Sequence, residues 1–170
     1  MRPHEHFLVA FLPVFVYALI RYRRLPSKAM LFVVVIGSLF PDIVDKPLAF
    51  SAGILPSGRV FMHSLPFVIP LSIIILAYGS FTDRSHLGLG FVWAHMTHLI
   101  GDFRSSLFDG QIPPDLIWPL APASFSPDIP WWARTTPVTV EVWTTFSVLV
   151  LGATVIVLSR DILSQFRQSG

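Results

Sequence analysis

LGLGFVWAHMTHLIGD, residues 87–102, is an apolar stretch that carries two histidines and ends in an aspartate. His95, His98 and Asp102 are spaced i, i+3 and i+7, so on a helix of about 3.6 residues per turn they share one face. Such groups are costly in an apolar segment unless they have a partner, and both types are ligands of divalent ions. The stretch therefore predicts a helix that contributes to a metal site. The alternative is a buried histidine pair that is hydrogen-bonded with the help of Thr97.

The rest of the chain is also strongly apolar. Hydrophobic residues make up 53% and charged residues 13% of the 170 residues, and the mean hydropathy is +0.65. This composition excludes an ordinary soluble domain and predicts a single integral membrane domain, residues 1–170, with membrane lipids as partners. The net charge of +2, with no basic stripe, excludes nucleic acid as an expected partner. Because the chain has no cysteine, nitrogen and oxygen atoms must hold any metal ion.

Five apolar stretches predict a helical membrane bundle. They are residues 7–20, 29–40, 65–78, 87–100 and 138–158. A crossing helix takes about 20 residues, so the first four stretches must extend into their polar flanks to span a membrane. We therefore expect an all-α polytopic membrane bundle of five spans, or of four spans plus a re-entrant or interfacial helix. The first stretch is followed by a basic cluster in place of a cleavage site, and we expect it to be retained.

Residues 103–137 carry seven prolines, which predict a Pro-rich extramembrane loop without a long helix. The tryptophans of this segment are expected to lie at the membrane interface or over a pocket.

Lysine and arginine counts orient the predicted spans. Seven of these residues lie on one side of the bundle (Arg21, Arg23, Arg24, Lys28, Arg84, Arg160 and Arg167), and five lie on the other (Arg2, Lys46, Arg59, Arg104 and Arg134). By the positive-inside rule the first side is cytoplasmic. This orientation predicts an external N-terminus and a cytoplasmic C-terminus in the plasma or inner membrane, and it puts the histidines and aspartates discussed here at the outer face.

Two further motifs bring polar groups to that face. His4 and His6 precede the first apolar stretch, where they either turn toward one point as ligands or remain solvated. Asp42 and Asp45 close the second stretch and, three residues apart, share one face of a helical turn. Both are candidates for the metal site. Alternatively, Asp42 caps a helical turn and Asp45 pairs with Lys46.

Arg59 and His63 precede the third stretch, four residues apart, so that on a helix they would share a face. We expect Arg59 to bind the phosphate or carboxylate of an anionic substrate. The alternative is an arginine that reaches lipid headgroups. His63 is expected to be a metal ligand or an acid/base group.

The order of these motifs resembles the YdjM-like family of inner-membrane-associated, metal-dependent hydrolases. The resemblance rests on an N-terminal histidine, GSLFPDIVD at 37–45, MHS at 62–64 and THLIGD at 97–102, and it covers about residues 1–120. The positions that the family's motifs mark are His6, Asp42, Asp45, His63, His98 and Asp102.

From the residues and this resemblance we predict hydrolysis at a centre of one or two Zn, Mn or Mg ions. The expected ligands are His6, Asp42, His98 and Asp102, with His4 and His95 as additional candidates. Asp45 is expected to bridge ions or act as general base. Headgroup depth favours a phospholipid or another lipid-linked ester as substrate. The alternatives are a non-enzymatic protein that binds or transports ions, and a scaffold whose polar groups are only interfacial.

Overall fold

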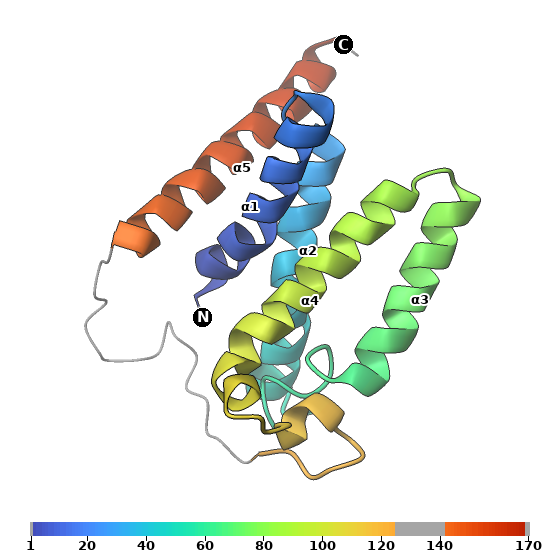
Figure 1. Ribbon diagram of the computed structural model, residues 1–170, viewed down its shortest axis with the longest axis vertical. Coiled ribbons are helices and arrows are strands. Elements are labelled where there is room, and N and C mark those ends of the chain that lie inside the picture. Colours follow the sequence, from blue (N-terminus) through green and yellow to red (C-terminus); the bar gives the residue numbers. More distant parts are fainter. Residues whose placement is uncertain (1, 125–141, 169–170) are drawn as a thin grey trace.

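The computed structural model describes residues 2–124 and 142–168, which fold into a bundle of α-helices (Figure 1). In chain order these are α1 (Pro3–Tyr22), α2 (Lys28–Lys46), α3 (Leu65–Phe81), α4 (Ser85–Phe108) and α5 (Val142–Gln168). Two short helical turns, η1 (Pro47–Ser51) and η2 (Pro114–Ile117), follow α2 and α4. No strand occurs in these two described ranges, and each predicted apolar stretch falls on one helix, apart from residues 138–141, which lie outside them. The predicted all-α class is confirmed.

The first four helices are longer than their apolar stretches because local signals put their ends in the polar flanks. Pro3 occupies the first helical position of α1, where its missing N–H costs nothing. Ser27 caps α2, since its Oγ accepts a hydrogen bond of 3.2 Å from Met30 N. α2 then continues past Pro41 to Lys46. Asp42 and Asp45 therefore lie on the last turns of a helix.

Three helices, α1, α2 and α4, pack around one apolar core. It consists of the fully buried residues Phe7, Ala10, Val34 and Ala94. Gly37 allows α2 and α4 to approach closely, because a Cβ at this position would lie 2.8 Å from the Phe91 carbonyl oxygen. Small residues at such contacts are typical of helices that pack in membranes. In Figure 1, α5 lies beside α1, and α3 lies beside α4.

Within the described part of the chain, only α1 is both long enough and apolar enough to meet the criterion for a membrane-spanning helix. α3 and the segment Thr144–Ile156 of α5 are apolar but shorter. α2 and α4 carry aspartates and histidines near their ends, and these groups lower the mean hydropathy of the two helices.

The Pro-rich segment begins later than predicted. α4 continues to Phe108, so residues 103–108 are helical, whereas the sequence predicted a loop from 103 to 137. The reason is that residues 103–108 contain no proline or glycine, and the helix ends just before Gly110, whose φ is +69°. Beyond it, Leu116 of η2 packs against Val68 of α3 and Leu99 of α4. Residues 125–137, which include two of the tryptophans, lie outside the described residues.

Candidate metal centre

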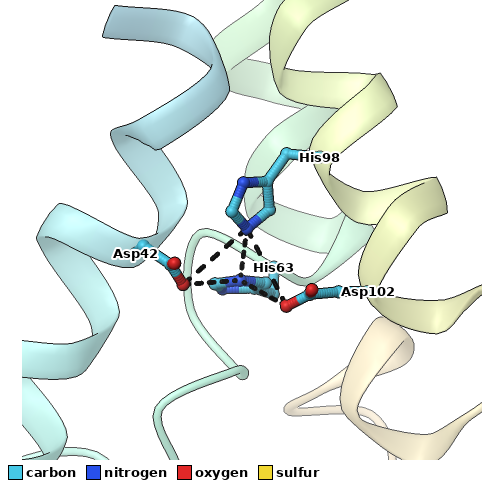
Figure 2. A group of neighbouring side chains, drawn as sticks. All are labelled: Asp42, His63, His98 and Asp102. Carbon is cyan, nitrogen blue, oxygen red and sulfur yellow. Dashed lines mark hydrogen bonds and ion pairs between the residues drawn. The ribbon is translucent and has the colours of Figure 1, made fainter. Parts of the chain in front are cut away.

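Four side chains from three segments converge at one buried point (Figure 2). Asp42 comes from the end of α2, His63 from the loop before α3, and His98 and Asp102 from α4. Each offers one nitrogen or oxygen, and these four atoms lie within 4.8 Å of one another. Both histidines are fully buried, and the two aspartate side chains are nearly so. The group has the composition of a site that could hold a divalent ion.

The distances between these atoms fit a single ion. The Nε2 atoms of His63 and His98 are 3.1 Å apart. Asp42 Oδ1 lies 3.6 Å and 3.7 Å from these two nitrogens, and Asp102 Oδ2 lies 3.7 Å and 3.9 Å from them. Ligand atoms about 2.0 to 2.2 Å from a zinc ion, at tetrahedral angles, are about 3.3 to 3.6 Å from one another. Five of the six distances are therefore close to those of a coordination sphere, and the sixth, between the two carboxylate oxygens, is at most 4.8 Å.

The hydrogen-bond partners of the two Nδ1 atoms indicate which ring nitrogen of each histidine carries the proton. His63 Nδ1 is 2.8 Å from Asp45 Oδ2, and His98 Nδ1 is 2.6 Å from the Ser38 carbonyl oxygen. Ionised carboxylate and carbonyl oxygens only accept hydrogen bonds, so each Nδ1 is the donor and each neutral ring has an unprotonated Nε2. The lone pairs of both Nε2 atoms then face each other and two carboxylate oxygens. A cation between them would turn this repulsion into ligation.

Asp42 provides independent support for a cation. Its Oδ1 is buried and accepts no hydrogen bond from the residues that the structure describes. Its other oxygen, Oδ2, is engaged in an ion pair with Lys46, one helical turn away. A buried carboxylate oxygen without a partner is rare and costly. Oδ1 is the oxygen that points at the two imidazoles, where an ion would satisfy it.

Asp45, an expected bridging ligand or general base, lies behind His63 and outside the group of four. It is fully buried, and both its oxygens are engaged. Oδ2 accepts a hydrogen bond from His63 Nδ1, and Oδ1 accepts one of 2.8 Å from the Met62 backbone N–H. A carboxylate behind a ligating histidine is the usual device that fixes the orientation of the ring.

His6, an expected ligand, also lies outside the group, behind Asp102. His6 Nε2 is 3.0 Å from Asp102 Oδ1, and its ring stacks on that of His98 with centroids 3.8 Å apart. Arg59 reaches the same carboxylate, with Nε 3.1 Å from Asp102 Oδ2. The Arg59 side chain is 34% exposed, so this cation lies at the rim of the centre.

The two additional candidates do not join the four residues. His95 lies on the predicted face of α4, but its Nε2 is 2.8 Å from the Met62 carbonyl oxygen and donates to it. This bond holds the loop that carries His63. His4 is half-buried near the start of α1, and its Nε2 finds no hydrogen-bond partner among the described residues.

Contacts of three residues, Ser38, Lys46 and Met62, were missed from the sequence. Lys46 pairs with Asp42, and not with Asp45 as one alternative had it; the i,i+4 spacing was the available signal. The Ser38 carbonyl and the Met62 peptide group hold histidines and Asp45 through backbone atoms. Backbone groups are present at every residue, so no side-chain pattern could have singled these out.

Fold and site together define a class, namely strongly apolar helical proteins with a buried centre of two histidines and two aspartates that could hold a metal ion. The model of one family, described as YdjM inner membrane protein, matches residues 1–165. The chain belongs to this family, which confirms the resemblance seen in the motifs and associates the protein with the membrane. No curated protein and no solved structure matches the chain.

Proposed function

We propose that the protein is a metal-dependent hydrolase that acts on a phospholipid or another lipid-linked ester at the outer face of the membrane. The observation that carries this proposal is the convergence of two imidazole nitrogens and two carboxylate oxygens on one buried point. A divalent ion there would supply a Lewis acid that activates water and stabilises charge on a substrate oxygen. Two nitrogen and two oxygen ligands suit zinc, and manganese and magnesium are the other candidates.

The geometry suggests distinct roles for the residues around the ion. Asp45 is a positioning residue for His63, in place of the bridging or general-base role expected from the sequence, because both its oxygens are engaged. His6 is likewise a positioning residue, for Asp102, in place of the expected ligand role. Arg59 combines a positive charge with partial exposure at the rim, which favours contact with an anionic group of the substrate.

The lipid substrate follows from the proposed membrane arrangement. We take all five helices as spans, with the N-terminus outside and the C-terminus in the cytoplasm. α3 supports this arrangement, since Ile69, Ile73, Ile74 and Tyr78 each have at least half of their surface exposed. Side chains of this kind are suited to contact with lipid. The centre then lies at headgroup depth, beside the ester and phosphate groups of lipids.

Apolar packing behind the centre supports an enzyme over a transporter. Transport of metal ions or protons would require polar groups that continue from the centre toward the other face. Further into the bundle, Ala94 lies about one helical turn from His98 on α4 and Val34 lies about two turns from Asp42 on α2, and both pack with Phe7 of α1. All three are fully buried and apolar.

A second candidate function is non-enzymatic metal binding. It is favoured by the number of protein ligands, since structural zinc sites use four whereas catalytic sites keep one position open. In this case the ion would hold α2, α4 and the loop before α3 together.

Turnover by the purified protein, loaded with Zn, Mn or Mg, separates the two candidates. Phospholipid and lipid-linked ester substrates are supplied in detergent, and product release is followed. The hydrolase proposal predicts activity with at least one ion and a loss of about 10²-fold or more in Asp42→Asn, because removal of a ligand should cost at least as much as removal of an outer partner. The exposed Asp109, at the end of α4, provides the control Asp109→Asn, which should keep full activity. Bound metal without turnover of any substrate would favour the non-enzymatic candidate.

A further inference from the structure

A cavity lies at the end of the bundle opposite the candidate metal centre. It has a volume of about 820 Å³ and lies between α1, α2 and α4, with Tyr17, Met30, Leu89 and Trp93 in its lining. Leu89 precedes His98 by nine residues on α4, a distance of about 14 Å along the helix. The size is within the range of about 300 to 1,000 Å³ that is common for ligand sites.

The walls of the cavity are mostly apolar, with Ser27 and His86 among the polar exceptions, and one side chain in them is held in place by a hydrogen bond. Trp93 Nε1 donates a hydrogen bond of 3.0 Å to the Ala10 carbonyl oxygen, which holds the indole ring between α4 and α1. Gly90 adds no side chain, and a Cβ there would come within 2.5 Å of Met30 Sδ. Tyr17 and Leu89 each have 59% of their surface exposed. A hollow with such walls is suited to a hydrocarbon chain rather than to water.

The mouth of the cavity carries positive charge. Arg24 lies in the lining, and its guanidinium carbon is 5.6 Å from the centroid of the Tyr22 ring, which also lines the cavity. The turns between α1 and α2 and between α3 and α4 both lie toward this end of the bundle (Figure 1). Around these turns, residues 21–28 and 82–86 contain Arg21, Arg23, Arg24, Lys28 and Arg84 against the single acid Asp83. Clusters of this kind bind anionic lipid headgroups.

We propose that this cavity binds an anionic phospholipid, with an acyl chain against the apolar walls and the headgroup phosphate at Arg24. The acyl chain matches the apolar walls and the phosphate matches Arg24. A free anion would contact only the arginine, and an uncharged hydrocarbon would contact only the apolar walls. The lining contains no carboxylate, so the site binds lipid and does not repeat the chemistry of the metal centre. The proposal is independent of the hydrolase activity.

Native mass spectrometry of the full-length, delipidated protein in detergent tests this site. The probes are dioleoyl phosphatidylglycerol, dioleoyl phosphatidylcholine and inorganic phosphate. We expect phosphatidylglycerol to be retained preferentially, and Arg24→Gln to weaken its binding about fivefold, as expected for loss of one basic contact. Arg24 is exposed, so this variant should fold. Arg104→Gln, an exposed arginine near the opposite end of α4 and outside the lining, is the control and should keep the preference.

A second variant tests the apolar part of the site. Ala18 lines the cavity, and Ala18→Phe should fill it and weaken retention of phosphatidylglycerol, with helical content measured by circular dichroism to verify folding. Equal retention of the two phospholipids, unchanged retention in Arg24→Gln, or binding of inorganic phosphate in place of lipid would each overturn the proposal.

Discussion

Each of the four converging side chains is held in place by at least one further group. Asp45 and the Ser38 carbonyl accept from the two histidines, Lys46 pairs with Asp42, and His6 and Arg59 contact Asp102. Such outer contacts fix the tautomer and orientation of metal ligands before the ion binds. Residue types and spacing were enough to single out Asp42, His98 and Asp102. For His63 the sequence left open a metal ligand or an acid/base group, and His6 was expected as a ligand; the choice between them depends on how the loop after α2 folds back.

The contact between Asp45 and His63 gives a prediction at the scale of the residue. Asp45→Asn keeps the size of the side chain but removes the charge that holds His63 Nδ1–H. We expect the affinity for metal to fall about 10- to 100-fold with the fold retained. Calorimetric titration of the purified protein with zinc measures this, with Asp109→Asn as the control. Wild-type affinity combined with slow turnover would instead favour the general-base role.

At the scale of the helices, the position of α2 against α4 determines the geometry of the centre. Asp42 is on α2 and His98 is on α4, and the two helices approach through Gly37. Hydropathy located the apolar middle of each helix. It could not locate the ends, because these depend on local signals such as Ser27 as the cap of α2 and Gly110, with a positive φ, just after α4.

Gly37→Val tests this helix contact. The new Cβ would meet the Phe91 backbone at 2.8 Å, where no side-chain rotation can relieve the clash. We expect a loss of about 1 to 3 kcal/mol in the free energy of unfolding, and weaker metal binding because α2 is displaced from α4. Gly152→Val is the matched control, since nothing lies within 4 Å of a Cβ there. Thermal unfolding in detergent compares the two variants. Equal melting temperatures would contradict the close approach of α2 and α4.

At the scale of the whole molecule, α1 to α4 alternate in direction, so the two ends of the bundle differ in character (Figure 1). The ends near Tyr22 and Ser85 are basic, and the opposite ends hold the candidate metal centre. By the positive-inside rule, a reporter fused to the C-terminus should be cytoplasmic, and one inserted near Ser124 should be external. Paired reporter fusions in intact cells make this measurement. The reverse pattern would put the centre on the cytoplasmic side and remove the argument for an outer-leaflet substrate.

The measurement that most directly tests a metal centre built by Asp42, His63, His98 and Asp102 is the amount of metal bound per chain. After loading with Zn, Mn or Mg and removal of free ion, elemental analysis of the wild type should find about one ion per chain. His98→Ala and Asp42→Ala should lose it, because each removes one of the four converging atoms. His86→Ala, a histidine change on the same helix but far from the centre, should retain it. Wild-type protein that binds none of the three ions, or equal metal content in all variants, would contradict the centre.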